Sequence, residues 1–233
     1  MTSCNQRASV ILPVLREAEN INRIIADLRA QAASDRTEII VVDGDPLGGT
    51  ISAIKEKSIV TALAPAGRAR QMNCGASLAT GDVLLFLHAD TRLPPKALAN
   101  VLAVMASERC SAGAFDLGID TARGIFRITE CYVALRTRLT RVPFGDQAIF
   151  MGRDYFFAIG GYKDIPLMED VEIMKRIRKR GDRICIIPDK IMTSPRRWEQ
   201  EGILFCTFRN WALQAGYALG VPPEQLAKWY RAH

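Results

Sequence analysis

The chain has 233 residues, of which 48% are hydrophobic and 24% charged, which is the composition of an ordinary globular protein. A chain of this length buries about 70% of its unfolded surface, and its composition excludes disordered, collagen-like and coiled-coil proteins. No segment approaches the roughly 20 uninterrupted apolar residues of a membrane span, and the first ten residues lack the apolar core of a signal peptide. A cytoplasmic protein is therefore expected.

Apolar runs alternate with helical periods through the first half of the chain. Strands are predicted at residues 9–14, 38–43, 59–63 and 83–87, and helices at residues 15–28, 69–79 and 98–105. Strands that are apolar throughout and separated by helices predict an α/β protein. Its central sheet should be mostly parallel and covered by helices on both faces.

The second half is less regular. Strands are predicted at residues 112–119, 147–152 and 183–187, helices at residues 124–140 and 168–180, and two further helices on either side of Val221-Pro222-Pro223. The arginines of the helix 124–140 form a solvated face or meet an anionic acceptor or lipid head groups. With no repeat and no linker in the sequence, a single domain over residues 1–233 is the simplest interpretation.

The net charge and the cysteine content indicate which classes of binding partner and which compartment suit this chain. The 31 Lys and Arg residues exceed the 25 Asp and Glu residues, and this mild excess of +6 suits an anionic substrate or an anionic membrane surface. No basic run is interleaved with aromatic residues, so nucleic acid is not expected as a partner. The six cysteines are scattered without a C-x-x-C pair, and only two histidines are present. Free buried thiols in a reducing compartment are expected rather than a zinc site.

Three acidic features follow or lie beyond predicted strands. Asp43 closes the second strand, Asp90 follows the strand 83–87, and Glu169 and Asp170 open a helix. In open α/β sheets, ligands bind beyond the carboxyl ends of the strands, so these carboxylates should cluster there. Each has an alternative role, because Asp43 can cap the next helix and acidic residues at 169 and 170 suit a helix start.

The order of these segments resembles the family 2 glycosyltransferases over residues 10–198. The matching segments are LPVLREAENI with Pro13, Glu17, Glu19 and Asn20; VDGDPLGGT with Asp43; GRARQMNCG with Arg68 and Asn73; ATGDVLLFLHADT with Asp90; the turn Gly160-Gly161-Tyr162; the pair Glu169-Asp170; and Arg197-Trp198. Each segment is weak alone, and together they are specific.

The resemblance implies the GT-A fold and an inverting transfer of a sugar from a nucleotide-diphosphate donor, expected to be a UDP-sugar, to an unknown acceptor hydroxyl. It divides the chain into a nucleotide-binding half at about 1–110, an acceptor and catalytic half at about 111–200, and C-terminal helices at 201–233. Asp90 maps to the carboxylate that holds a divalent metal, Mn²⁺ or Mg²⁺. Asp170 is the expected general base, with Glu169 as the alternative.

The resemblance also suggests which residues contact the donor. The nucleotide-binding residues would be Pro13, Glu17, Asp43, Arg68, Arg70, Asn73 and His88. Asp146, in the segment Phe144-Gly145-Asp146-Gln147, contacts the donor sugar or caps a turn. Arg197 and Trp198 clamp the diphosphate or belong to a solvated basic turn.

Two departures from the family pattern bear on the donor site. His88 replaces the first acid of the D-x-D motif, and a neutral imidazole binds a ribose hydroxyl or a metal without adding negative charge. A hydrogen-bonded core histidine is the other interpretation. Gly44-Asp45-Pro46 replaces D-G-S, which alters the loop beside the nucleotide.

Two other classes of protein are less consistent with the sequence. A sugar-phosphate nucleotidylyltransferase would carry a glycine-rich loop after the first strand, where this chain has Leu12-Pro13-Val14-Leu15-Arg16-Glu17. A nucleotide-sugar sensor without activity would not need the base, whereas Glu169 and Asp170 are both present.

Overall fold

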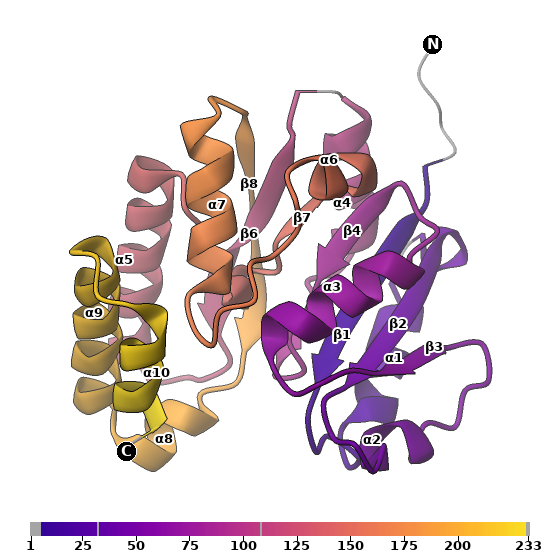
Figure 1. Ribbon diagram of the computed structural model, residues 1–233, viewed down its shortest axis with the longest axis horizontal. Helices are drawn as coiled ribbons and strands as arrows, with labels where there is room; N and C mark the ends of the chain where they lie inside the picture. Colours follow the sequence, from indigo (N-terminus) through magenta and orange to yellow (C-terminus); the bar gives the residue numbers. More distant parts are fainter. Residues whose placement is uncertain (1–5, 32, 108, 232–233) are drawn as a thin grey trace.

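The computed structural model describes residues 6–31, 33–107 and 109–231, and within these ranges it gives no side-chain description for Arg197, Leu204 and Arg231. Figure 1 shows a sheet in the middle of the molecule with helices on both sides. The first half contains β1 (Ala8–Val14), α1 (Ile21–Arg29), η1 (Ser34–Arg36), β2 (Thr37–Asp43), α2 (Gly49–Ser52), β3 (Val60–Leu63), α3 (Arg68–Leu78), β4 (Val83–Phe86), β5 (Thr91–Arg92) and α4 (Ala97–Ala106).

The second half is built from shorter and more varied elements. They are β6 (Ala112–Ile119), α5 (Ile125–Thr140), η2 (Gly145–Gln147), β7 (Phe150–Gly152), α6 (Arg153–Ala158), α7 (Glu169–Lys179), β8 (Ile184–Thr193), α8 (Arg196–Glu201), α9 (Ile203–Ala218) and α10 (Pro223–Arg231). The short helices η2, α6 and α8 are too brief to give a periodic signal in the sequence, which is why none was predicted.

Two predicted boundaries differ from the structure by six residues, more than any other. The first helix begins at Ile21 instead of residue 15, because Arg16 adopts a positive φ of 60° that breaks the helical path. The strand β8 continues to Thr193, well beyond residue 187, with an irregular register at Phe115 and Asp116 of its partner β6. This extension carries the chain to the carboxyl edge of the sheet, where β5 pairs with it.

The eight strands lie in the order β3-β2-β1-β4-β7-β6-β8-β5. Pairing is parallel among β3, β2, β1 and β4, and again between β6 and β8, whereas β7 is antiparallel to both of its neighbours. The sheet is therefore parallel from β3 to β4, as predicted for the first half of the chain, and mixed beyond β4. Because β7 is antiparallel to β4, the start of β7 at Phe150, which η2 precedes in the chain, lies beside the carboxyl end of β4.

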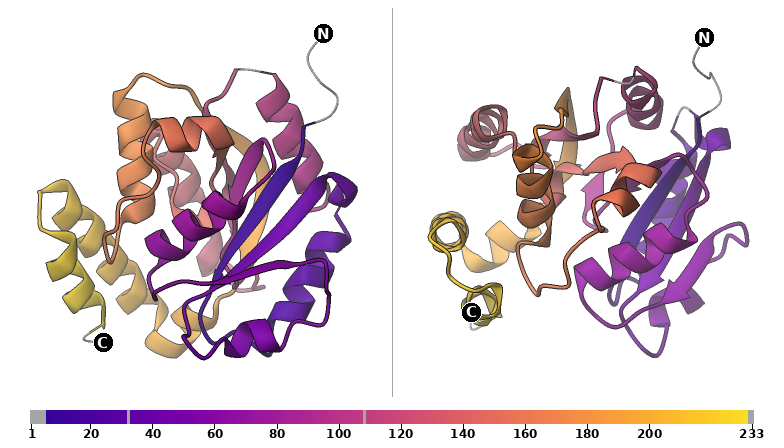
Figure 2. Two further views of the ribbon diagram at one scale, coloured as in Figure 1. Left: turned by 45° about the vertical axis from the view of Figure 1, so that its right-hand side comes forward. Right: turned by 45° about the horizontal axis from the view of Figure 1, so that its top comes forward.

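Both faces of the sheet are buried. Val10 and Leu12 of β1 pack with α1 and α4 on one face, and Ile11 packs with α3 and the helices of the second half on the other. Figure 2 shows these two layers of helices, with α9 and α10 at the edge of the molecule far from β3. Such alternation between two covered faces explains why β1 is apolar at almost every position.

The cysteine prediction was wrong for two residues. Cys110 and Cys185 form a disulfide, with Cα atoms 5.8 Å apart and 75 residues of separation. The parallel pairing of β6 with β8 brings their first residues together, and no local sequence pattern indicates this pairing. Cys74, Cys131 and Cys206 are free, and Cys4 lies outside the described residues.

Candidate active site

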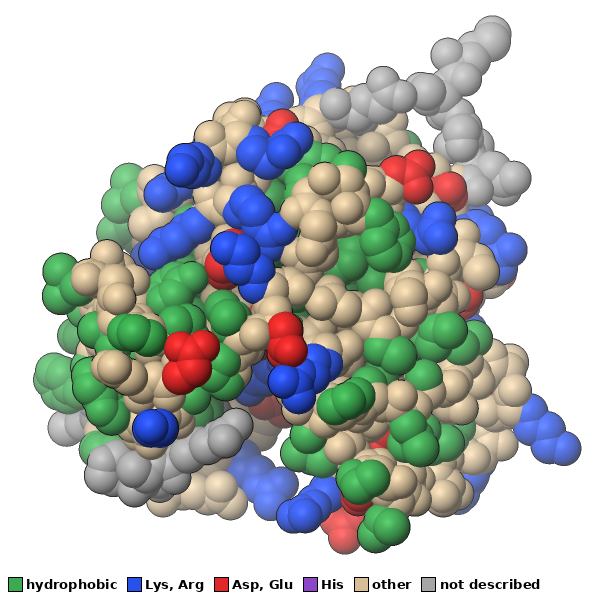
Figure 3. Space-filling model, in the orientation of Figure 1, with side chains coloured by type: hydrophobic (Ala, Val, Ile, Leu, Met, Phe, Trp, Pro, Cys, Tyr) green, Lys and Arg blue, Asp and Glu red, His purple; other side chains and the backbone are tan. Residues whose placement is uncertain are grey.

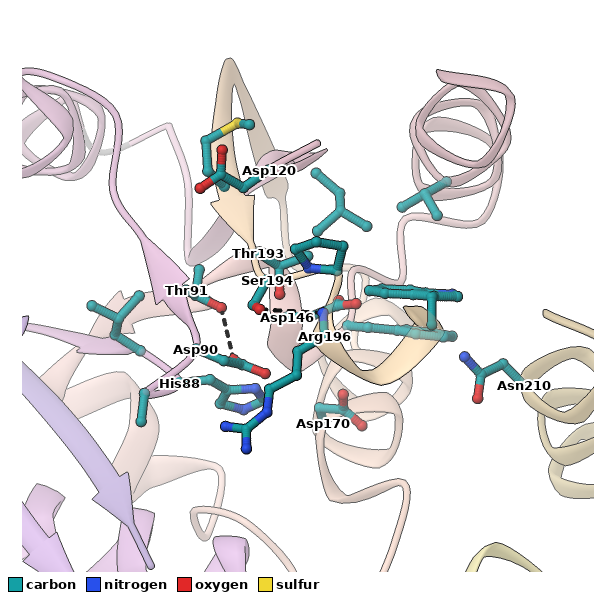
Figure 4. A pocket seen from close by; sticks show the side chains of 18 of the residues that line it. His88, Asp90, Thr91, Asp120, Asp146, Asp170, Thr193, Ser194, Arg196 and Asn210 are labelled. Atoms are coloured by element: carbon teal, nitrogen blue, oxygen red, sulfur yellow. Dashed lines mark hydrogen bonds between the residues drawn. The ribbon is translucent and has the colours of Figure 1, made fainter. Parts of the chain in front are cut away.

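A cavity of about 600 Å³ lies beyond the carboxyl ends of the strands. Its polar side chains come from both halves of the chain: the loop after β1, α1, the start of α3, the loop after β4, α5, η2, the start of α7, α8 and α9. Figure 4 shows the carboxylates of Asp90, Asp146 and Asp170 around this space, with Arg196 extending between His88 and Asp170. Two of the three predicted acidic features, Asp90 and the pair Glu169-Asp170, thus meet at one place, whereas Asp43 does not line the cavity.

Asp90 and His88 lie in the turn that follows β4. The backbone N–H of Thr91 donates to the carbonyl of His88 at 3.1 Å, and the N–H of Ser194 donates to the carbonyl of Asp90 at 3.0 Å. The Thr91 hydroxyl donates to Oδ1 of Asp90 at 3.2 Å. These bonds fix the backbone while Asp90 stays exposed to the cavity.

The described residues contain no group of three or more His, Cys, Asp and Glu side chains arranged to hold a metal ion. Mg²⁺ and similar ions are commonly held by one or two carboxylates together with substrate phosphates and water. The exposed carboxylate of Asp90, in a cavity that also presents arginines, fits an ion of this kind that binds together with a diphosphate.

Glu169 and Asp170 form the first turn of α7 and both line the cavity. Oδ2 of Asp170 accepts a hydrogen bond from the N–H of Gly145 at 2.6 Å, and its Oδ1 accepts one from the N–H of Val171 at 2.7 Å. Glu169 is only 3% exposed and lies 4.0 Å from Arg68. Burial, and then the charge of Asp170, raises the pKa of Glu169 to about 7, against the opposing charge of Arg68.

Asp146 lies in η2 beside this pair. Its Oδ1 is buried and has no hydrogen-bond partner in the described part of the structure. Burial is the main reason that its pKa is raised to about 6, and the carboxylates of Asp170 and Asp90 add to the effect, while Arg136 and Arg68 oppose it. An orphaned buried carboxylate oxygen in a cavity is available for a ligand hydroxyl.

Arg136 was not predicted as a site residue. Its guanidinium lies 3.6 Å from the centre of the Phe144 ring and donates to Oε1 of Gln147 at 3.2 Å. Burial lowers the pKa of Arg136, although the charge of Asp146 opposes this effect. The sequence does hold a signal, because Thr129 and Val133 precede Arg136 by seven and three residues and all three line the cavity on one helical face.

The other residues predicted to contact the donor lie partly in the cavity and partly at the surface. Arg68 lines the cavity, whereas Arg70 lies outside it and pairs with Asp164 at 2.8 Å. Trp198 lines the cavity and packs edge-on against Phe126, with ring centroids 5.9 Å apart. The side chain of Arg197 lies outside the described part of the structure.

Asp43 does not face the cavity. Its side chain is fully buried, with Oδ1 accepting from the N–H of Asp45 at 2.9 Å and Oδ2 from the N–H of Thr50 at 3.0 Å. Both oxygens therefore hold the loop that leads into α2, which is the capping role that the sequence left open. A direct contact with a nucleobase is not available to this carboxylate in the observed conformation.

The remaining predicted nucleotide residues have different surroundings. Glu17 lines the cavity and accepts a 2.9 Å hydrogen bond from Asn20. Asn73 exchanges hydrogen bonds of 2.8 and 3.0 Å with the backbone of Tyr162, so it joins α3 to the Gly-Gly-Tyr turn. Pro13 lies in β1, and neither it nor Asn73 lines the cavity.

Comparison with known proteins agrees with this architecture. Residues 9–163 match the family described as glycosyl transferase family 2. Two curated relatives, uncharacterized glycosyltransferases from two strains of Mycobacterium tuberculosis, are 29% identical over 178 residues, which cover 72% of this chain and 67% of theirs.

Solved structures of glycosyltransferases share the fold. A mannosyltransferase from Pyrobaculum calidifontis, solved in complex with GDP-Man and Mn²⁺, superposes with a TM-score of 0.65 at 22% identity, over 82% of this chain and 57% of that one. The TarS protein of S. aureus gives a TM-score of 0.62 at 14% identity, over 81% of this chain and 36% of that one. The family match over two thirds of the sequence confirms the resemblance, and the chain is a GT-A-fold enzyme that belongs to glycosyltransferase family 2.

Proposed function

We propose that the protein transfers a sugar, with inversion, from a nucleotide-diphosphate donor to an acceptor hydroxyl, with Asp170 as the general base. The observation that carries this proposal is the meeting of Asp90, Asp146, Glu169 and Asp170 around one cavity that also contains arginines. A diphosphate leaving group needs positive charge beside it, and an acceptor hydroxyl needs a carboxylate to take its proton.

Asp170 suits the role of base better than Glu169. Burial raises the pKa of Glu169 to about 7, and the same burial, at 3% exposure, leaves little room for an acceptor hydroxyl beside this carboxylate. Asp170 is also the less buried of the two, and each of its oxygens accepts one hydrogen bond from a backbone N–H, so lone pairs remain for the acceptor hydroxyl. In the transfer, the acceptor oxygen bonds to the anomeric carbon as the bond to the diphosphate breaks, and Asp170 receives the hydroxyl proton.

A divalent metal held by Asp90 would neutralise charge on the departing diphosphate. Arg68, which lines the same cavity from the start of α3, would bind the diphosphate directly. The free oxygen of Asp146 would accept a hydrogen bond from a hydroxyl of the donor sugar, with Arg136 offsetting its charge.

Uridine is the proposed base of the nucleotide, from the resemblance of the chain as a whole to the family. The P. calidifontis mannosyltransferase was solved with GDP-Man, so guanosine is the alternative to test. Because Asp43 holds its own loop, the base would be read by backbone groups of residues 44–50, whose arrangement Asp43 fixes.

A thermal-shift screen of UDP-sugars and GDP-sugars, with and without Mn²⁺, tests the donor. Binding at a hundredfold excess over the dissociation constant stabilises a protein by about 2.7 kcal/mol, which such a screen detects. Stabilisation by UDP-sugars is the expected result. Stabilisation by GDP-sugars alone would reject uridine as the base and would leave the proposed transferase activity unaffected. No stabilisation by any nucleotide sugar would contradict the proposed donor class.

A further inference from the structure

The outer face of α5 is apolar and open to solvent. Ile128, Leu135 and Leu139 are 72%, 60% and 75% exposed, and Tyr132 lies between them on the same face. Their spacing of three, four and seven residues places them in one stripe along the helix. A surface helix normally turns such a stripe toward the core, whereas the core side of α5 is already occupied by Phe126, Glu130 and Thr137.

The outer face of α9 continues this stripe. Phe205 and Phe208 are 44% and 62% exposed, and Ala212 and Ala215 on the same side are exposed as well. The ring of Trp211 lies 5.3 Å from that of Tyr132 and 5.8 Å from that of Phe208, so the two helices form one surface. We call this surface, made of Ile128, Tyr132, Leu135, Leu139, Phe208 and Trp211, the α5–α9 surface. Figure 3 shows hydrophobic side chains along the edge of the molecule where these helices lie.

The exposed residues that flank the surface are basic, whereas the arginines within α5 are engaged elsewhere. Arg136 turns toward the cavity, and Arg138 pairs with Asp116 at 2.6 Å. The sequence of α5 contains three arginines and a single carboxylate, Glu130, which is buried and paired with Arg127 and Lys190. The sequence of α9 contains no carboxylate. Arg123 and Arg141, which flank α5, are both exposed. An apolar stripe rich in aromatic residues, bordered by arginines and without an exposed carboxylate of its own, complements an anionic lipid surface.

The α5–α9 surface also borders the active-site cavity. Tyr132 and Trp211 line the cavity and are 40% and 43% exposed, so they lie at its edge. Glu17 and Arg68 line the same cavity from the nucleotide-binding half. A second copy of the chain seated on the surface would cover the cavity edge at Tyr132 and Trp211. A fluid bilayer would instead leave the nucleotide side in water and present acceptors at that edge.

We propose that the α5–α9 surface docks the protein on an anionic lipid bilayer. Within the described residues, no helix is long and apolar enough to cross a bilayer, and the surface lies along two helices that would rest in the interface. The cavity edge would then lie at the membrane, so the acceptor hydroxyl belongs to a molecule held in or on the bilayer; this last step rests on the proposed function.

The test measures binding of the purified protein to phosphatidylglycerol vesicles and to phosphatidylcholine vesicles by flotation, without nucleotide or acceptor. The variant Leu135→Gln/Leu139→Gln/Phe208→Gln changes three exposed residues of the surface. Leu63→Gln/Leu78→Gln/Phe157→Gln is the matched control, because these two leucines and one phenylalanine are also exposed and lie outside the α5–α9 surface. Each apolar side chain that enters the interface contributes roughly a factor of ten to partitioning, so the surface variant should bind phosphatidylglycerol vesicles at least about tenfold more weakly.

We expect the wild type and the control to bind phosphatidylglycerol vesicles more tightly than phosphatidylcholine vesicles, with binding weakened by salt. Equal binding by the surface variant and the wild type would overturn the proposal, as would the absence of wild-type binding to phosphatidylglycerol. A stable dimer in sedimentation that the surface substitutions dissociate would overturn it in favour of a second copy. Leu139→Gln alone, at the most exposed position, provides the test if the triple variant has a lower melting temperature. Nucleotide-sugar binding is measured separately on the same variants, so failure of vesicle docking and failure of the proposed function are distinguishable.

Discussion

The backbone N–H of Gly145 donates a 2.6 Å hydrogen bond to Oδ2 of Asp170. This bond joins η2, which carries Asp146, to the first turn of α7. A Cβ atom at position 145 would lie 3.0 Å from the ring of His88 and 3.1 Å from Oδ2 of Asp170, so the absence of a side chain lets three segments approach one another. The carboxylate proposed as base is therefore oriented by the backbone of a segment 25 residues earlier in the sequence.

Replacing Asp170 by Asn should lower turnover by about 10²–10⁴-fold, the usual contribution of a positioned base. Donor affinity should change little, because the base contacts the acceptor hydroxyl and not the nucleotide. Single-turnover transfer is the measurement, and slow hydrolysis of the donor by water replaces it until an acceptor is known. Glu169→Gln is the control and should cost less. Retained turnover in Asp170→Asn with loss in Glu169→Gln would reverse the assignment.

Replacing Asp90 by Ala should remove the metal-dependent part of nucleotide binding. Calorimetry with a uridine diphosphate species is the measurement, with and without Mn²⁺. Because the described residues hold no three-ligand cluster, Mn²⁺ alone should bind weakly even to the wild type. His88→Asp adds a second carboxylate to the turn and should strengthen the metal-dependent part. An Asp90→Ala protein with unchanged metal-dependent affinity would show that Asp90 does not hold the ion.

The raised pKa of Asp146 should make the folded protein less stable as the pH rises from about 4 to about 6. Its pKa rises from 3.8 to about 6 on folding, so between these values the folded protein binds the proton more tightly than the unfolded chain. The free energy of unfolding therefore falls as pH rises through this window. Asp146→Asn cannot ionise and should gain about 1–3 kcal/mol relative to the wild type between pH 4 and pH 7. Urea unfolding at several pH values measures the difference, and parallel pH profiles of the two proteins would contradict it.

Replacing Asp43 by Ala should destabilise the protein in the absence of any ligand. The substitution removes the acceptors of two backbone N–H groups, those of Asp45 and Thr50, in a buried position. Hydrogen bonds to a charged group contribute about 1.5–3 kcal/mol each, so a loss of about 3–6 kcal/mol is expected in denaturant unfolding. Asp45→Ala, at a less buried position of the same loop, is the control. Unchanged stability together with weakened nucleotide binding would instead support a direct contact between Asp43 and the base.

Reduction of the disulfide between Cys110 and Cys185 should lower the free energy of unfolding. A crosslink that closes a long loop restricts the unfolded chain, and its loss typically costs about 2–4 kcal/mol. Denaturant unfolding with and without reductant measures the change, and Cys110→Ser/Cys185→Ser should reproduce it. Cys131→Ser is the control, because this thiol is exposed and free. A wild type equally stable with and without reductant would show that the crosslink does not form.

The sequence alone determined the strands and helices of the first half of the chain and the place of the candidate site in the sheet. The strand patterns and motif spacing are local properties, so β1, β2, β4 and α3 could be read along the chain, and the rule that ligands bind at strand carboxyl ends placed Asp90 and Asp170 together. The family resemblance rested on the same local segments, and the match of residues 9–163 to the family confirms it.

Only the tertiary structure decided which groups face the cavity and which surfaces remain open. The inward turn of Arg136, the burial of Asp43 within its own loop and the pairing of Cys110 with Cys185 each depend on how distant segments pack. The apolar face of α9 is the clearest example. An amphipathic pattern separates the apolar face of a helix from its polar face, but it does not determine which face packs against the core. That choice depends on contacts between elements far apart in the sequence, which no local pattern encodes.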